Sequence, residues 1–503
     1  MKVSPTAAPQ GTVRDWLDHR AVMSGERSGY LFFDGGAPLT WSQLRNRARN
    51  LAARLTAQGL EKSASVAIMQ PNGREAIECL YGVLYGGFRA TVINLAAGDD
   101  AIRYALDHCE ARIALVGAAQ QDLFNRVRTD VLRQLPQADG TNPVDLYDLL
   151  PDDDALLMYT SGTTGQPKGV VHSNSSLLAG GWTPTIAHDL TSKDIGLCVL
   201  PINHINGLCV TVLGTLICGG ALAVAEKFSA SRFWDQCESA QATWFSVVPT
   251  IISHLLHSET GPSPNVRERL RFGRSASAAL APDVQNNFEK RFDVPIVETM
   301  GLTETAAQIL SNPLPPGIRK VGSPGKAIGN DVCILSAALE PRGPNTQGEI
   351  AVRGPNVMRE YFKNPDATQE TFTSDGWLRT GDLGHLDNDG YVFVTGRLKE
   401  LIIKGGENIA PREIDEALYS HPDVIEAAAF ARPCKTYGER VEAAVKLKDD
   451  TRVAPEHLIA ICREKLGSFK TPDVIHVLDD LPKGPSGKIQ RIKLVSLTGS
   501  PTS

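Results

Sequence analysis

Two kinds of hydrophobic pattern alternate along the first half of the chain. In the segment TWSQLRNRARNLAARL, apolar residues recur every three or four positions between Leu44 and Leu55, behind a capping box of Thr40 and Gln43. This spacing predicts an amphipathic helix. Short, mostly apolar runs follow, such as SVAIMQ, ATVIN, IGLCVLP, ALAVA and TWFSVVP. Runs of this kind are typical of strands buried on both faces of a parallel sheet, so the pattern predicts an α/β fold.

The pattern changes near Gly317, where Gly and Pro punctuate β-type runs such as GEIAVRGPNV and GYVFVTGR. This pattern of short β-type runs separated by Gly and Pro predicts a distorted β-barrel. After Thr395, the chain carries its own helical segment (PREIDEALYSH) and strand segments (EAAAFA and EAAVKLK). We therefore expect a large N-terminal domain of residues 1–395, built from stacked parallel sheets, helices and the barrel. Residues 396–503 are expected to form a small α+β C-terminal domain.

Composition and charge narrow the class of protein. Hydrophobic residues make up 42% of the chain, charged residues 21%, and the net charge is -6. These values favour a soluble globular protein and argue against a nucleic-acid or anionic-membrane partner. The uncharged segment from Gly207 to Ala225 is interrupted by Gly219 and Gly220, which favours a buried helix and a strand over a membrane span. Nine Cys without a CxxC pair indicate reduced thiols and a cytoplasmic location. Monomer and homodimer both stay open.

A glycine-rich loop is the first candidate for chemistry. The stretch YTSGTTGQPKGV from Tyr159 to Val170 follows the apolar run ALLMY, which predicts a strand that ends in a loop of backbone and hydroxyl donors. Such a loop suits phosphate oxygens, and Lys168 adds a mobile positive charge. Pro167 and Gly169 depart from the nucleotide P-loop pattern. The loop alone predicts a phosphate site, with ATP favoured, and leaves open a plain Ser/Thr/Gly-rich surface loop.

Five motifs in order resemble the adenylate-forming superfamily, which includes acyl-CoA synthetases, peptide-synthetase adenylation domains and firefly luciferase. YTSGTTGQPKGVV is similar to the family's signature loop. The others are ETMGLTE (298–304), WLRTGDLG (377–384), GRLKELIIKGGENIAPREIDE (396–416) and LPKGPSGKIQR (481–491). The resemblance extends from about residue 15 to residue 495. It implies ATP and coenzyme A as substrates, Mg²⁺ as cofactor and a small carboxylic acid as the third partner.

The resemblance also implies a role for each matching position. Residues expected at the ATP phosphates are Thr160, Ser161, Gly162, Thr163, Thr164, Gly165, Lys168 and Thr303. Residues expected around adenine and ribose are Ser277, Ala278, Glu298, Thr299, Met300, Gly301, Asp382 and Arg397. Met300 stands where the family usually has an aromatic residue. Glu304 would coordinate Mg²⁺, which prefers oxygen ligands. Lys488, rather than Lys168, would be the catalytic lysine that stabilises charge on the α-phosphate.

In acyl-CoA synthetases a second half-reaction follows the first. The resemblance implies that the C-terminal domain rotates about a hinge, which Lys399 occupies here, and withdraws Lys488. The loop with Gly405 and Gly406 would then lie beside the pantetheine arm of CoA. Its thiol attacks the acyl-adenylate, and AMP leaves.

The acid is the least determined part of the prediction. His204 and Asn206 come from LPINHINGL (200–208), which resembles the family's LPxxHxxG segment, and Arg274 and Ser275 come from GRSASAALAP (273–282). The second segment, together with SNPLPPGIRKVGSPG (311–325), resembles the oxalate- and malonate-type CoA ligases. The fifth residue expected near the acid is Ala307, shortly after the LTE motif. Polar side chains here favour a short polar or dianionic acid, because buried donors reject a ligand that cannot satisfy them. Ala307 replaces a His of oxalate-type relatives and so favours malonate or sulfoacetate over oxalate.

Other readings stay open from the residues. His204 serves equally well as a packing or gating residue. The enzyme could instead load a separate carrier protein, or act on an aromatic or medium-chain acid. A luciferase-like oxygenase and a non-catalytic ATP-binding regulator are the remaining alternatives.

Overall fold

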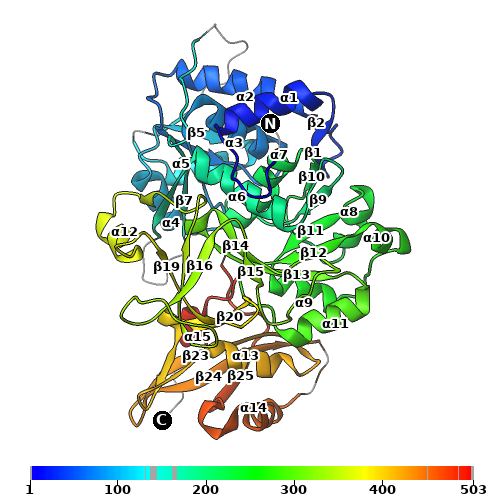
Figure 1. The fold of residues 1–503 in the computed structure, drawn as a ribbon, viewed down its shortest axis with the longest axis vertical. Helices are drawn as coiled ribbons and strands as arrows, with labels where there is room; N and C mark the ends of the chain where they lie inside the picture. The colour runs from blue at the N-terminus through cyan, green and yellow to red at the C-terminus, as the bar shows by residue number, and fades with distance from the viewer. Residues whose placement is uncertain are drawn as a thin grey trace.

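The structure is a computed structural model that describes residues 3–130, 132–135, 144–160, 167–449, 451, 453–484 and 487–499. It is an α/β protein in which a large N-terminal part carries two mainly parallel sheets and a smaller C-terminal part lies beneath them (Figure 1). This architecture confirms the predicted fold class.

The larger sheet has nine strands within the described ranges. In spatial order they are β15 (Lys326–Ala327), β14 (Ala307–Ser311), β13 (Ile296–Leu302), β12 (Phe272–Ser275), β11 (Trp244–Val247), β9 (Ile195–Cys198), β10 (Ala221–Val224), β1 (Ser28–Phe32) and β2 (Leu39–Thr40). The pairs from β13 to β1 are parallel. Polar groups at the ends of β11, β12 and β13 therefore gather at one edge, where the candidate site lies.

The second sheet has seven strands in the part of the chain that the structure covers. They are β18 (Glu360–Tyr361), β8 (Gly169–Ser173), β7 (Asp154–Tyr159), β4 (Arg89–Val92), β3 (Ser65–Met69), β5 (Ile113–Val116) and β6 (Arg133–Gln134). The strand predicted before the glycine-rich loop is β7. It pairs with β8 in antiparallel register, so the loop joins two neighbouring strands.

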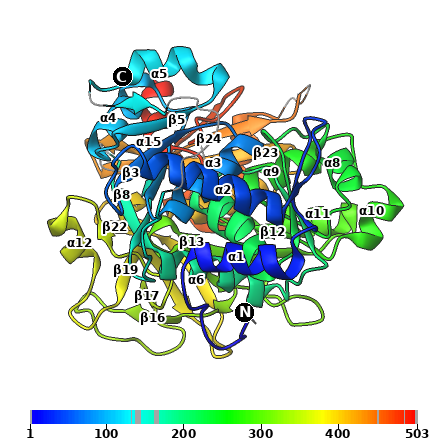
Figure 2. The same cartoon turned by 90° about the horizontal axis from the view of Figure 1, so that it is seen from above.

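Helices cover both sheets, and α1 and α2 lie across the face that is toward the viewer in Figure 2. The helices of the N-terminal part are α1 (Val13–Ser24), α2 (Trp41–Thr56), α3 (Arg74–Gly86), α4 (Asp99–His108), α5 (Gln121–Val127), α6 (Asn174–Ala187), α7 (Gly214–Cys218), α8 (Phe233–Ser239), α9 (Pro249–His257), α10 (Pro264–Arg269), α11 (Pro282–Phe292) and α12 (Pro365–Thr371). The described residues also include three 3₁₀ turns, η1 (Ala118–Gln120), η3 (Thr303–Thr305) and η4 (Leu398–Glu400), and a π-helical segment, η2 (Asn206–Leu213). The capping box of Thr40 and Gln43 begins α2 as predicted.

The Gly/Pro-punctuated region forms a four-stranded antiparallel sheet in the order β16 (Asp331–Leu335), β17 (Gly348–Arg353), β19 (Leu378–Leu386) and β20 (Val392–Arg397). Its apolar side packs around Ile309, Ile334, Ile350 and Val392. The predicted distorted barrel thus takes the form of an open antiparallel sheet against β14.

The residues after β20 have a hydrophobic core of their own, around Ile402, Ile414, Val441 and Leu458. The strands of this part are β21 (Ile402–Lys404), β22 (Glu407–Ile409), β23 (Val424–Cys434), β24 (Gly438–Leu447) and β25 (Val474–Val477). Its helices are α13 (Pro411–Tyr419), α14 (Pro455–Lys470) and α15 (Arg491–Leu497). No helix among the described ranges is both long and apolar enough to cross a bilayer.

Candidate active site

A cavity of about 230 Å³ lies where the C-terminal part meets the edge of the nine-stranded sheet. Its walls include each residue that the sequence placed at adenine and ribose, together with the predicted catalytic lysine: Ser277, Ala278, Glu298, Thr299, Met300, Gly301, Asp382, Arg397 and Lys488. These residues come from five separate segments of the sequence: 273–282, 298–304, 377–384, 396–416 and 481–491. The fold therefore brings together what the sequence placed up to 211 residues apart.

Lys488 reaches this cavity from the C-terminal part. Its Nζ lies 3.3 Å from Oε1 of Glu400, and Arg491 approaches Oε2 of the same carboxylate at 3.4 Å. Burial alone would raise the pKa of Glu400, but Lys488, Arg491 and Arg397 outweigh it and hold that pKa below its ordinary value. Arg491 is in turn fixed by Asp415 at 2.5 Å. A charge-balanced network thus holds the lysine on the cavity wall.

Asp382 and Arg397 face each other on neighbouring strands. They are register partners in the β19–β20 pair, and Nε of Arg397 lies 3.4 Å from Oδ1 of Asp382. Burial raises the pKa of Asp382, although Arg397 and Lys488 oppose the change. A carboxylate in this position can accept hydrogen bonds from two neighbouring hydroxyls, as the predicted ribose contact requires.

Strand β13 supplies another part of the cavity wall. Glu298 is buried and its Oε1 accepts a hydrogen bond from the Leu280 amide at 3.0 Å, while Oε2 has no partner among the described residues. Burial raises the pKa of Glu298 to about 7. A Cβ at Gly301 would lie 1.7 Å from the carbonyl oxygen of Ala307, so only glycine fits between β13 and β14. The unpartnered oxygen fits a cavity that receives a hydrogen-bonding ligand.

The predicted phosphate loop is only partly described. Ser161, Gly162, Thr163, Thr164 and Gly165 lie outside the described residues. At its two ends, the Thr160 amide donates to the Lys168 carbonyl at 2.9 Å. The loop therefore closes across the base of the β7–β8 hairpin.

The side chain of Lys168 contacts Tyr361, a residue that the sequence analysis did not identify as part of the site. Its Nζ lies 4.4 Å from the ring centroid of Tyr361, whose hydroxyl donates to Oε1 of Glu304 at 2.7 Å. Tyr361 thus joins the predicted pyrophosphate lysine to the predicted Mg²⁺ ligand. Tyr361 lies in REYFKNP, shortly before Asn364 and Pro365, which begin α12, and nothing in this local sequence identifies it as a site residue.

Neutral groups hold the turn that carries Thr303 and Glu304. His172 is fully buried, burial lowers its pKa to about 4, and its Nε2 donates to the Thr303 carbonyl at 2.7 Å. The Met358 amide donates to the Glu304 carbonyl at 2.7 Å. Glu304 therefore presents its carboxylate from a fixed backbone. Within the described ranges, no group of three or more His, Cys, Asp and Glu side chains could hold a metal ion without help.

The residues predicted for the acid form a buried polar cluster next to the cavity. Arg274 is fully buried, and its guanidinium donates to Gln308 at 3.0 Å, to Asn206 at 2.7 Å and to Ser246 at 3.1 Å. Asn206 then donates through Nδ2 to Oγ of Ser277 at 3.3 Å. Arg274 consequently lies one layer behind the cavity wall and connects to it through Asn206 and Ser277.

Arg274 carries its charge among neutral partners. Burial lowers its pKa to about 9, and no described carboxylate forms an ion pair with it. His188 shares the Gln308 oxygen at 3.3 Å, and burial lowers the pKa of His188 to about 3, so this ring is neutral. His188 Nδ1 and Gln308 Nε2 have no hydrogen-bond partner among the residues described. The cluster therefore combines an uncompensated cation with unused polar atoms.

His204, Ser275 and Ala307 complete the predicted acid residues. Burial lowers the pKa of His204 to about 4, and its Nδ1 accepts from the Asn206 amide at 3.3 Å, which makes it a neutral ring. Ser275 is buried with an unpartnered Oγ. Ala307 has φ of 86°, next to Ala306 at 43°, and Ser277 has 74°. Positive φ is a strained conformation for a residue other than glycine, and here it occurs at three residues of the segments around the cavity.

The hinge and CoA residues lie apart from the cavity wall. Lys399 lies two residues beyond Arg397 in η4, the 3₁₀ turn that begins at Leu398. Gly405 and Gly406 form the turn between β21 and β22, with φ of 59° and 86°. The neighbouring Lys404 is buried and donates to the Phe469 carbonyl at 3.0 Å. The structure thus does not bring this glycine pair to Lys488, and its role stays a prediction.

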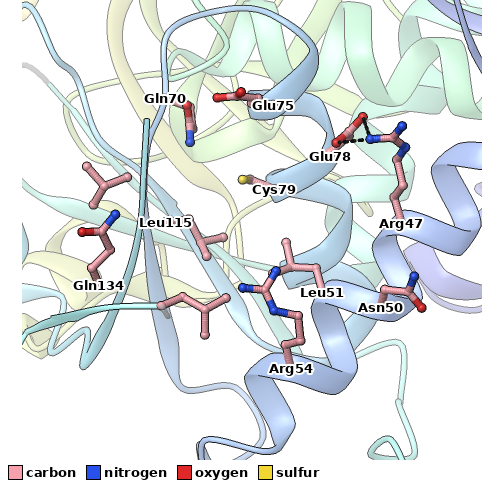
Figure 3. A pocket seen from close by; sticks show the side chains of 12 residues that line it. Arg47, Asn50, Leu51, Arg54, Gln70, Glu75, Glu78, Cys79, Leu115 and Gln134 are labelled. Carbon is pink, nitrogen blue, oxygen red and sulfur yellow. Dashed lines mark hydrogen bonds and ion pairs between the residues drawn. The ribbon is translucent and has the colours of Figure 1, made fainter. Parts of the chain in front are cut away.

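A second cavity, of about 340 Å³, lies far from these groups in the sequence and in the fold. It opens between α2, α3, β5 and β6, and Figure 3 shows Arg47 of α2 paired with Glu78 of α3 at its rim. None of its lining residues belongs to the predicted site. The 230 Å³ cavity, which brings together residues of these five segments and includes Lys488, is the candidate active site.

The sequence was compared with protein-family models and with known proteins. The family model described as AMP-binding enzyme matches residues 12–362, and that of the AMP-binding enzyme C-terminal domain matches residues 413–488. The chain is 43% identical to a sulfoacetate–CoA ligase of Cupriavidus necator, over 95% of this chain and 96% of the relative. It is 36% identical to an oxalate–CoA ligase of Arabidopsis thaliana, over 92% and 94%.

A solved structure agrees with these sequence relationships. The ATP-bound structure of MatB from Rhodopseudomonas palustris resembles the fold with a TM-score of 0.88 at 27% identity, over 97% of this chain and 99% of that one. Because the first family model covers more than half of the chain and the relatives match almost end to end, this protein belongs to the AMP-binding enzyme family.

Proposed function

We propose that this enzyme is an AMP-forming acid–CoA ligase that acts on a short carboxylic acid with a second acidic group. In the first half-reaction, a carboxylate oxygen attacks the α-phosphorus of ATP, and the bond to pyrophosphate breaks. In the second, the CoA thiolate attacks the acyl carbon of the adenylate, and the bond to AMP breaks. The ligase class follows from the family and from relatives that are named CoA ligases.

The chain's own residues supply positioning and charge for the first half-reaction. Asp382 would accept the ribose hydroxyls, and Arg397 would hold the nucleotide against β20. Lys488 would move its ammonium from Glu400 to the α-phosphate oxygens, where negative charge develops. Lys168 would bind the departing pyrophosphate. Mg²⁺ held by Glu304 would neutralise phosphate charge, and a single carboxylate suits an ion that the substrate's phosphates also coordinate.

The proposal that the acid has a second acidic group rests mainly on Arg274. A buried cation without a carboxylate partner costs free energy, which a bound anion can offset. The chain Arg274–Asn206–Ser277 transmits this positive potential to the cavity wall. A fatty or aromatic acid would leave the charge of Arg274 without a counter-ion, whereas a short dianion would offset it.

His204 would act as a neutral hydrogen-bond donor to the same acid. Because Nδ1 already accepts from the Asn206 amide, the proton of the neutral ring lies on Nε2. An N–H donor of this kind suits an anionic oxygen. Malonate and sulfoacetate both have the required length and charge, and the relative that is named a sulfoacetate–CoA ligase makes the sulfonate a strong candidate.

The test is CoA-dependent release of AMP and pyrophosphate with sulfoacetate, malonate, oxalate, propionate, benzoate and octanoate. Propionate is the matched control, because it has the three-carbon chain of malonate and only one carboxylate. We expect kcat/KM to be highest for one of the dianions. A preference for benzoate or octanoate would refute the polar pocket, and pyrophosphate release without acyl-CoA would identify a carrier protein as the acceptor.

A further inference from the structure

Helix α9 carries a polar stripe on an otherwise apolar helix. Its polar residues Thr250, Ser253, His254 and His257 recur at intervals of three and four, which places them on one face. The opposite face, with Ile251, Ile252 and Leu255, is buried in the core of the N-terminal part. A polar stripe with this spacing is available for contact with another part of the molecule.

The stripe contacts the C-terminal part at the start of β23. Oγ of Ser253 donates to the Ile425 carbonyl at 2.6 Å, and Nε2 of His254 donates to Oε1 of Glu426 at 2.9 Å. Nε2 of His257 lies 3.4 Å from the Pro422 carbonyl. Three successive polar residues of α9 thus engage a single five-residue segment across the boundary between the two parts.

The same stripe reaches the segment that carries Lys488. Oγ1 of Thr250 donates to the carbonyl of Gly487 at 3.3 Å, and Gly487 directly precedes the lysine. Glu426 also lies 2.8 Å from Nζ of Lys483, five residues before Lys488. The side chain of Glu426 is fully buried between His254 and Lys483. This buried carboxylate therefore links α9 to the lysine segment.

We propose that the polar face of α9 is a positioning surface that holds Lys488 on the cavity during adenylate formation, with His254 and Glu426 as its principal contact. The inference rests on the proposed function, in which the C-terminal part must leave this position before CoA reacts. The contacts to Ile425, Glu426 and Gly487 exist only while that part is docked on α9. Weakening them should therefore reduce adenylate formation and leave thioester formation intact.

The variants His254→Ala and His254→Gln separate a positioning role from a merely structural one. Alanine removes the donor to Glu426, whereas glutamine places an amide N–H near the position of Nε2. Ser258→Ala is the control, because Ser258 follows α9 and its hydroxyl contacts Thr260 within the N-terminal part. Each protein is assayed for acid-dependent ATP–pyrophosphate exchange and, separately, for the single-turnover conversion of preformed acyl-adenylate and CoA to acyl-CoA.

We expect His254→Ala to lower pyrophosphate exchange about tenfold, the effect of one lost hydrogen bond to a charged group. Thioester formation should be unchanged or faster, and His254→Gln should restore most of the exchange rate. Equal losses in both half-reactions would mean that His254 only supports the fold, and no loss in either would remove α9 from the mechanism. Wild-type enzyme that shows neither half-reaction would instead refute the proposed function.

Discussion

The hydroxyl of Tyr361 donates a hydrogen bond of 2.7 Å to Oε1 of Glu304, while the ring of the same tyrosine lies under the ammonium of Lys168. One side chain thereby sets the positions of two groups that are predicted to act on the ATP phosphates and their Mg²⁺. The charge of Glu304 also acts on the pKa of both Asp382 and Arg397, so this set adjoins the cavity.

Tyr361→Phe tests this relationship. Phenylalanine keeps the ring under Lys168 and removes only the donor to Glu304. Loss of one hydrogen bond to a carboxylate costs about 1.5 kcal/mol, so we expect the Mg²⁺ concentration for half-maximal activity to rise about tenfold. Tyr391→Phe is the control, because Tyr391 also lies beneath a lysine ammonium and donates its hydroxyl elsewhere, to the Ile318 carbonyl. An unchanged Mg²⁺ requirement would contradict the role of Tyr361.

Lys488→Ala should separate the two half-reactions. Removing the fixed positive charge at the α-phosphate should lower acid-dependent pyrophosphate exchange by roughly 10²- to 10³-fold, the scale found when one preorganised electrostatic donor is lost. Transfer of a preformed acyl-adenylate to CoA should change less than about threefold, because the proposed rotation of the C-terminal part would withdraw Lys488 in that step. Lys493→Ala on α15 is the matched control. Equal losses in the two steps would show that Lys488 is not specific to adenylation.

Arg274→Met removes the buried cation and keeps a long apolar side chain. We expect kcat/KM for the preferred dianion to fall by roughly 10²-fold and that for propionate by less than about tenfold, since only the dianion uses the uncompensated charge. Arg89→Met controls for the general cost of losing a buried arginine, because Arg89 pairs with Asp154 away from the cavity. If both acids lose activity to the same extent, Arg274 is a purely structural residue.

Local sequence patterns were sufficient to predict several elements of the fold and many residues of the candidate site. The capping box at Thr40, the apolar runs and the ordered motifs predicted α2, the parallel strands and the set of residues around the cavity. These features depend on short-range chemistry. The π-helical start at Asn206 was not predicted, because a helix that is apolar on every side has no periodicity from which its pitch can be read.

The contacts between residues far apart in the sequence depend on tertiary packing and could not be predicted from the sequence. Tyr361 lies 57 residues beyond Glu304, and no local sequence pattern predicts the hydrogen bond between the two side chains. The sequence placed Arg274 near the acid, but its position behind Asn206 follows from how β12 packs against η2 and β14. The polar stripe of α9 was not identified from the sequence, because its function depends on the partner segment at the start of β23, which only the folded structure shows.

Glu298 makes the stability of the fold depend on pH in a direction opposite to that of most carboxylates. Its pKa is raised from 4.5 to about 7 in the folded protein, because the carboxylate is buried. The folded state therefore holds a proton that the unfolded chain releases above pH 4.5. The resulting stabilisation is fully present below pH 4.5 and is lost as the pH rises through 7, a difference of roughly 3 kcal/mol.

Glu298→Gln should abolish this dependence, because glutamine keeps the Oε1 acceptor for the Leu280 amide and cannot ionise. Urea denaturation at pH 5.5 and pH 8 measures it: relative to the wild type, the variant should gain stability as the pH rises. Glu289→Gln is the control, since Arg319 and other hydrogen-bond donors hold the pKa of Glu289 below its ordinary value. Its difference from the wild type should stay constant over that range. A Glu298→Gln difference that also stays constant would mean that Glu298 is already ionised at pH 5.5, and that the cavity presents a full negative charge to the nucleotide.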